Sequence, residues 1–154
     1  WANLEKKNVN FHFIGALQSK KVKNIINYFN VIETLDTESS AKKLANILTK
    51  VTIPPKIFLQ INLGKEKMKR GIFAYDVGAF LQMCKEKYNL NIDGAMCLPP
   101  KDKDAKKYFI SMREICIKNN LKNISMGMSR DYIEAIEYGS TNIRVGELIF
   151  GKRK

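Results

Sequence analysis

The chain has 154 residues, of which 45% are hydrophobic and 27% charged, with a formal net charge of +12. This composition excludes a largely disordered protein, and the length suits one domain over residues 1–154 with its own core. No apolar run approaches the roughly 20 residues of a transmembrane helix, and the first residues lack a signal peptide's apolar segment, so we expect a cytoplasmic protein.

Short apolar runs predict six strands, and apolar residues at helical spacing predict a helix after each of the first five. In chain order, the expected elements are a strand at 11–15, a helix at 20–29, a strand at 31–35, a helix at 36–50, a strand at 56–62, a loop rich in Gly and Lys, a helix at 74–88, a strand at 92–98, a helix at 104–119, a strand at 122–126, a helix at 129–139, a strand at 142–145 and a final turn at 148–151. No linker or change of composition interrupts this alternation.

Local signals mark several of the expected boundaries. Asp36 or Thr37 caps the second helix, and Ser129 or Asp131 starts the fifth. Gly139 ends the fifth helix, as glycine often does in a left-handed conformation. Alternating strands and helices of this kind predict an α/β fold with a parallel sheet and helices outside it.

We expect the fold class to be a (β/α)8 TIM-type barrel, of which the chain supplies six units. A doubly wound sheet is the alternative. The barrel is favoured because the informative residues follow the strands, at the carboxyl edge where such barrels carry their sites. A full barrel has eight units and about 200–250 residues, so the chain is two units short.

The densest signal lies in two consecutive segments, residues 124–131 and 139–151, in which a turn follows a strand. A Ser/Gly turn between a strand and a helix offers backbone N–H groups and a hydroxyl to a phosphate. If two units are missing from the front, these turns follow strands seven and eight, where barrels commonly bind phosphate. The alternative is that Ser129 only caps a helix and Gly127 only forms a turn.

Arg144 alternates with Ile143 and Val145, so its guanidinium is expected to point into the barrel mouth. A buried guanidinium needs an acceptor or an anionic partner. Two explanations stay open at this stage: Arg144 faces a ligand, or it forms an ion pair with Glu33 or Glu147.

His12 is the only histidine, and the carboxylates do not cluster, so we expect no metal site and favour a packed, hydrogen-bonded His12 over a catalytic one. Cys84, Cys97 and Cys116 share no CxxC spacing. An odd number of cysteines without a secretion signal indicates free thiols in a reducing compartment, here packed as small core residues.

The positive charge has two explanations. A nucleic-acid-binding surface would gather basic residues, and specific base readout relies on Arg. Because nearly all of the charge here is Lys, we favour compositional drift of the kind that an AT-rich genome produces. We therefore expect no nucleic-acid partner and no membrane partner, and keep nucleic-acid binding as an alternative function.

Four segments together resemble the pyridoxal phosphate homeostasis proteins, the stand-alone relatives of the alanine racemase N-terminal barrel. These segments are residues 12–18, 94–97, 125–131 and 143–151. They follow one another in the family's order, and the resemblance covers essentially the whole chain. Lys20 and Ala95 depart from the Asn and Leu that the family usually has there.

The resemblance implies a barrel that holds pyridoxal 5'-phosphate (PLP) at its carboxyl mouth. It implies a carrier of the cofactor in vitamin B6 and amino-acid/keto-acid homeostasis, without robust catalysis; a PLP-dependent, racemase-like enzyme is the alternative. Within that resemblance, the expected cofactor-binding residues are Ser129 and the backbone of Gly146 and Glu147 at the phosphate, Arg144 at the pyridine nitrogen, and His12, Asn62 and Met96 near the ring.

The largest departure from the family lies at the front of the chain. The family's first strand carries the lysine that forms the Schiff base, its second carries a Phe-Gly-Glu-Asn segment, and neither is present here. Trp1 matches the region just after that segment. The resemblance therefore implies strands three to eight of the barrel, with no catalytic residue assigned. We expect a monomer for the intact protein, and association for a truncated barrel with open edges.

Overall fold

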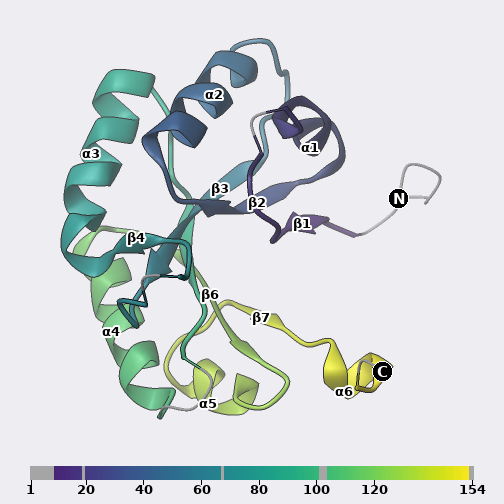
Figure 1. Cartoon of the computed structure of the whole chain (residues 1–154), viewed down its shortest axis with the longest axis vertical. Coiled ribbons are helices and arrows are strands. Elements are labelled where there is room, and N and C mark those ends of the chain that lie inside the picture. Colours follow the sequence, from purple (N-terminus) through teal and green to yellow (C-terminus); the bar gives the residue numbers. More distant parts are fainter. Residues whose placement is uncertain (1–8, 19, 67, 101–103, 153–154) are drawn as a thin grey trace.

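The computed structural model describes residues 9–18, 20–66, 68–100 and 104–152. Within these residues, one curved sheet runs through the molecule, and six of its strands lie side by side in chain order (Figure 1). Every neighbouring pair is parallel. These strands are β1 (His12–Phe13), β2 (Val31–Leu35), β3 (Lys56–Asn62), β5 (Gly94–Cys97), β6 (Asn123–Met128) and β7 (Asn142–Arg144).

Helices follow the strands, and all but the last, short one cover the convex side of the sheet (Figure 1). They are α1 (Val22–Tyr28), α2 (Glu38–Leu48), α3 (Val77–Tyr88), which follows the 3₁₀ turn η1 (Ala74–Asp76), α4 (Lys106–Lys118), α5 (Tyr132–Glu137) and α6 (Glu147–Phe150). Because the strand order never reverses, the sheet has no switch point of the doubly wound kind. The expected barrel is confirmed as a partial one, with β1 and β7 at the two ends of the strand order.

Two apolar clusters fill the space between the sheet and its helices. One is built around Ile32, Leu35 and Leu44, and the other includes Phe109 and Met126. All five are fully buried, and burial of a large apolar side chain contributes about 1.5–3 kcal/mol. The apolar residues that recur at helical and strand spacing in the sequence form these two clusters.

The concave face of the sheet is more polar. Its buried residues belong to neither apolar cluster and include Val31, Glu33, Phe58, Gln60, Asn62, Met96 and Ser125. A carboxylate in such a place is costly unless hydrogen bonds or opposite charges compensate it. The inside of the partial barrel therefore has the polar character of a functional site.

The expected strands at 31–35 and 56–62 are confirmed without change, while 11–15 shortens to β1 and 92–98 to β5. Thr37 caps α2, since its hydroxyl accepts from the Ser40 N–H at 3.2 Å. The expectation that the loop before residue 74 is strandless was wrong: β4 (Ile72–Phe73) pairs with the end of β3. Two residues are too few to show a period in the sequence. Next to this strand, a Cβ on Gly71 would lie 2.7 Å from the Asn62 backbone nitrogen, so the chain passes close to β3 there.

The three cysteines are free and buried, as expected. Burial raises the pKa of the Cys84 thiol to about 11 and that of the Cys116 thiol to about 12. Protonated buried thiols are poor nucleophiles, so these residues serve the core.

Candidate functional site

A chain of four polar side chains crosses the concave face from one edge of the sheet to the other. His12 Nδ1 lies 2.6 Å from Glu33 Oε1. The Ser125 hydroxyl donates to Glu33 Oε2 at 2.6 Å, and Arg144 Nη1 donates to Ser125 Oγ at 2.5 Å. These residues come from β1, β2, β6 and β7, so one network connects the two edge strands.

Glu33 is the centre of this network and is 1% exposed. Burial alone would raise the pKa of its carboxyl group. The hydrogen bonds from His12 and Ser125 and the charge of Arg144 outweigh that effect, so the pKa lies below its ordinary value. Glu33 is therefore an anion at neutral pH, held by donors on both of its oxygens.

Arg144 points to the concave face, as its alternation with Ile143 predicts. Its Nη2 donates to the Cys97 carbonyl at 2.8 Å, and its Nη1 lies 3.9 Å from Glu33 Oε2. Burial lowers the pKa of Arg144, and the charge of Glu33 opposes this. Of the two carboxylates that the sequence offered as partners, the structure brings Glu33, and not Glu147, to the guanidinium.

The two Ser/Gly turns after β6 and β7 meet at Ser129. Its hydroxyl oxygen accepts from the backbone N–H groups of Gly146 at 3.3 Å and Leu148 at 3.4 Å. One alternative from the sequence, that Ser129 caps α5, is wrong. Asp131 is the N-cap residue of α5, and its carboxylate accepts from the Met128 N–H at 2.6 Å. Ser129 is thus free of a role at α5, and its hydroxyl oxygen instead meets the backbone donors at the start of α6.

A pocket of about 470 Å³ connects this turn with the guanidinium. Ser129, Arg144, Gly146 and Glu147 line it together with Pro99 and other residues of the carboxyl edge. No heavy atom lies within 4 Å of the position that a Cβ of Gly146 would occupy, so the backbone is open to a ligand there. A pocket of this size, with a few convergent donors, is typical of small-molecule sites.

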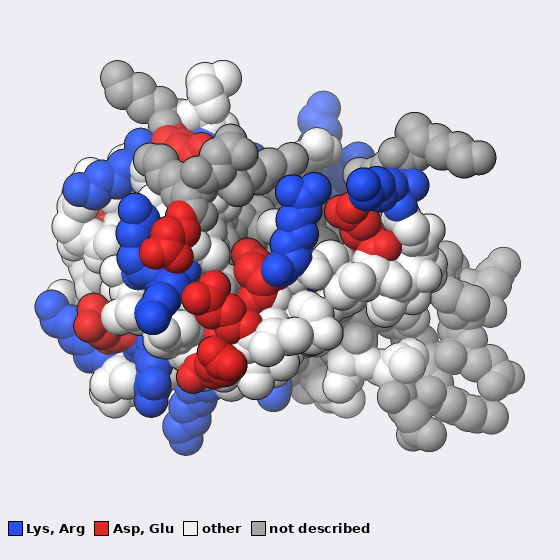
Figure 2. Space-filling view, turned by 90° about the horizontal axis from the view of Figure 1, so that it is seen from below, with Lys and Arg blue, Asp and Glu red and all other residues white. Residues whose placement is uncertain are grey.

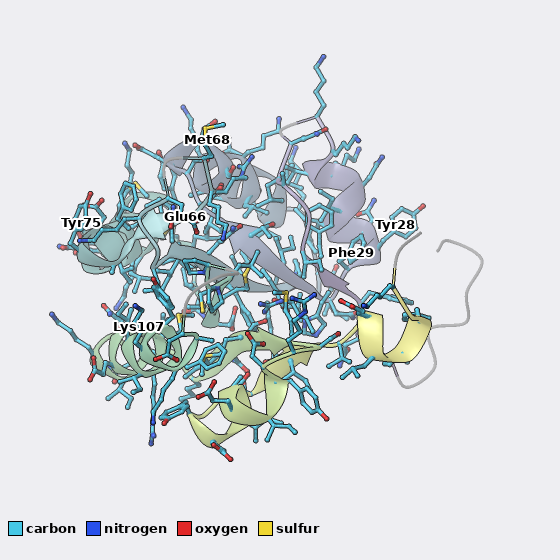
Figure 3. The ribbon with its side chains drawn as sticks, turned by 60° about the horizontal axis from the view of Figure 1, so that its bottom comes forward. Tyr28, Phe29, Glu66, Met68, Tyr75 and Lys107 are labelled. Carbon is cyan, nitrogen blue, oxygen red and sulfur yellow. The ribbon has the colours of Figure 1, made fainter. Side chains whose placement is uncertain are left out.

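Asn62 and Met96 lie on the concave side at some remove from this turn. Asn62 Nδ2 donates to the carbonyls of Glu66 at 3.0 Å and Lys69 at 3.1 Å, so its amide holds the loop after β3. Figure 3 shows Met68 projecting from that loop. Met96 is 2% exposed and pairs in register with Ser125, beside the polar network.

Two further features of the mouth were missed by sequence reasoning. Arg70 forms a double hydrogen bond with Asp36, at 2.6 and 2.9 Å, which fixes the same loop to the end of β2. Ser125, the link between Glu33 and Arg144, stands out in the sequence only as part of the segment 125–131. A hydroxyl among four consecutive buried strand residues, 124–127, is the signal that marks it.

Lysine is scarce on the strands. Among the described strands only β3 carries one, Lys56, which is exposed at the amino end of that strand, away from the network. The described residues contain no cluster of His, Cys, Asp and Glu suited to a metal ion. They also contain no helix with the length and apolar character needed to cross a bilayer.

Within its described residues, the protein is a parallel partial barrel with donors for an anion and a buried guanidinium at its carboxyl edge. The alanine racemase N-terminal domain family matches residues 4–154. The pyridoxal phosphate homeostasis protein of Aquifex aeolicus is 32% identical, covering 98% of this chain and 70% of its own length. That of Schizosaccharomyces pombe is 36% identical over 94% of this chain and 66% of its own.

Solved structures agree with this assignment. PipY of Synechococcus elongatus without PLP superposes with a TM-score of 0.85 at 29% identity, over 94% of this chain and 72% of that one. The same protein with PLP bound gives a TM-score of 0.81. The chain belongs to the pyridoxal phosphate homeostasis protein family, within the alanine racemase N-terminal domain family. It spans 66% to 72% of the length of these relatives.

Proposed function

We propose that this chain binds PLP at the pocket between Ser129 and Arg144 and serves as a cofactor carrier in vitamin B6 and amino-acid/keto-acid homeostasis. The proposal rests on one observation: the Ser/Gly turn at Ser129, of a kind that can bind phosphate, and the buried guanidinium of Arg144 line the same pocket. The names of the relatives and the PLP-bound structure of PipY support the choice of ligand.

The residues present fit the two ends of this cofactor. The phosphate is an anion, and the Ser129 hydroxyl is a donor suited to it. The N–H groups of Gly146 and Leu148, which here donate to Ser129 Oγ, would turn to the phosphate when it binds. Glu147 would contribute its backbone only, because its carboxylate repels a phosphate. Arg144 uses one N–H on Ser125 and one on Cys97, which leaves further donors for the ring nitrogen.

Arg144 also limits the chemistry that the site can support. When bound, PLP supplies an electrophilic aldehyde and an electron-withdrawing ring. A guanidinium only donates and does not give up its proton, so a pyridine nitrogen facing Arg144 stays unprotonated. An unprotonated ring withdraws electrons less strongly, which suits storage and transfer of the cofactor better than rapid turnover.

His12, Asn62 and Met96 are proposed to line the ring side of the site. His12 is at the exposed end of the polar network, with 30% of its side chain accessible. Met96 is buried next to Ser125, and the amide of Asn62 is engaged by the loop after β3, so both would act by shaping the cavity.

We further infer that the protein acts as one domain in the reducing cytoplasm, where three buried thiols stay free. No nucleic-acid role is proposed. On the face shown in Figure 2, acidic side chains lie among the basic ones, so this face offers no continuous basic surface. A salt titration of nucleic-acid binding tests this, because phosphate contacts give a steep dependence on salt.

Direct binding tests the proposed function. Calorimetric titration should show that the chain binds PLP and that it binds pyridoxal and inorganic phosphate more weakly. Phosphate should compete with PLP for the site. Ser129→Ala removes one hydroxyl donor and should weaken PLP binding by about 1.5–3 kcal/mol, with little effect on pyridoxal. The exposed Ser39 provides the control Ser39→Ala, which should bind as the wild type does. Equal PLP affinity in Ser129→Ala would contradict the assignment of the phosphate end.

A further inference from the structure

Only one assignment of donors and acceptors is consistent with all the hydrogen bonds around Glu33. The Ser125 hydroxyl has one hydrogen, which it gives to Glu33, so Arg144 must donate to the lone pair of Ser125. An ionised carboxylate only accepts. His12 Nδ1, at 2.6 Å from the other oxygen of Glu33, must therefore carry a hydrogen.

We propose that Glu33 is the positioning residue of the site: it orients Arg144 through Ser125 and fixes His12 as the Nδ1–H tautomer. The inference deepens the proposed function and rests on it where the cofactor is concerned. Glu33 is 1% exposed and connects strands at opposite edges of the partial barrel, so its effect reaches both sides of the pocket mouth.

The consequence for His12 is chemical. With Nδ1 donating to Glu33, the neutral ring presents Nε2 as an acceptor, whereas free histidine in water favours the opposite tautomer. A partly exposed acceptor at the mouth suits a hydroxyl or ammonium group of a bound small molecule. Glu33 itself touches no ligand in this scheme and acts through its neighbours.

The consequence for Arg144 is geometric. Ser125 Oγ and the Cys97 carbonyl anchor two different guanidinium nitrogens, at 2.5 and 2.8 Å. Because Ser125 is itself held by Glu33, the plane of the guanidinium is fixed before a ligand arrives. Preorganisation of this kind reduces the entropy lost on binding.

The tautomer is directly measurable because His12 is the only histidine in the chain. The ¹⁵N shifts of the imidazole, recorded in its neutral form in the complete 154-residue chain, should show Nδ1 protonated and Nε2 bare. An Nε2–H tautomer in the wild type overturns the proposal without the need for any variant.

Glu33→Gln supplies the second measurement. The amide has one acceptor and one donor end, so with Ser125 still donating to its oxygen, its NH₂ faces His12 and the ring should switch to the Nε2–H form. The exposed Glu114 on α4 provides the control Glu114→Gln, which should leave the His12 signals unchanged. An unchanged His12 spectrum in a folded Glu33→Gln variant counts against the proposal.

Ser125→Ala separates the effect of Glu33 on Arg144 from its effect on His12. It removes the hydrogen-bonded link between Glu33 and Arg144, leaves only their charge contact at 3.9 Å, and should weaken PLP binding about tenfold, while the His12 tautomer stays as in the wild type. If the wild type binds PLP and Ser125→Ala and Glu33→Gln bind it equally well, positioning by Glu33 is wrong and the proposed function stands. If the wild type does not bind PLP, the proposed function fails and the His12 spectra alone decide the role of Glu33.

Discussion

At the scale of single residues, the site depends on how one buried charge is compensated. Glu33 lies in a strand whose five residues are all buried, where an unpaired carboxylate would be strongly unfavourable. His12, Ser125 and Arg144 supply the donors and the positive charge that hold it. The same contacts that make Glu33 tolerable also orient the groups proposed to face the ligand.

The lowered pKa of Glu33 predicts a pH dependence of stability. Its carboxyl group takes up a proton more readily in the unfolded chain, where its pKa is near the ordinary value of 4.5. The stabilisation is therefore present above about pH 4.5 and is lost as the pH falls through the lowered folded value. Urea unfolding of the wild type and Glu33→Gln should differ by about 1.5–3 kcal/mol at pH 7.

That difference should shrink steadily below about pH 4.5 as Glu33 is protonated in the wild type. Glu114→Gln serves as the control, because Glu114 is exposed and is expected to show no comparable difference. A gap between wild type and Glu33→Gln that stays constant down to pH 3 would show that the charge of Glu33 contributes nothing.

At the scale of elements, the turn after β6 depends on how closely β6 approaches α5. Gly127 has a φ of +91°, and a Cβ there would lie 2.5 Å from Cβ of Ala135 on α5. Only glycine combines this backbone conformation with that contact. The approach places α5 tightly against β6 and determines where Ser129 emerges.

Gly127→Ala should therefore destabilise the protein and displace the phosphate turn. The strained φ and the clash with Ala135 together are expected to cost about 2–4 kcal/mol. Thermal melting followed by circular dichroism measures the loss. Gly78 on α3 provides the matched control, since the nearest atom to its Cβ position is 3.8 Å away, and Gly78→Ala should preserve or raise stability. Equal melting of Gly127→Ala and wild type would refute this account.

At the scale of the whole molecule, the open sides of the partial barrel are apolar. β1 and β7 end the sheet, and near β7 the side chains of Leu148, Ile149 and Phe150 on α6 are 61%, 68% and 85% exposed. Ile143 on β7 is 39% exposed. Strand edges that pair with no other described strand, beside exposed apolar residues, favour association.

The 154-residue chain should therefore self-associate as its concentration rises. Multi-angle light scattering over a dilution series measures this, and Phe150→Ser should shift the equilibrium toward monomer. Ile53→Ser is the control, because Ile53 is equally exposed at 85% but lies outside the strands and helices, in the segment between α2 and β3. A monodisperse monomer at every concentration, with a sharp cooperative melt, would contradict the prediction.

The sequence was sufficient to predict the barrel-type order of strands and helices, because apolar periodicity reflects which face each element buries. It also marked Ser129, Arg144 and Gly146, since residues that follow strands in consecutive units share one edge of a parallel sheet. Glu33 and Ser125 lie 92 positions apart, and their hydrogen bond inside the barrel becomes visible only in three dimensions. Such a pairing depends on sheet curvature across several strands, and no local pattern of residues encodes it.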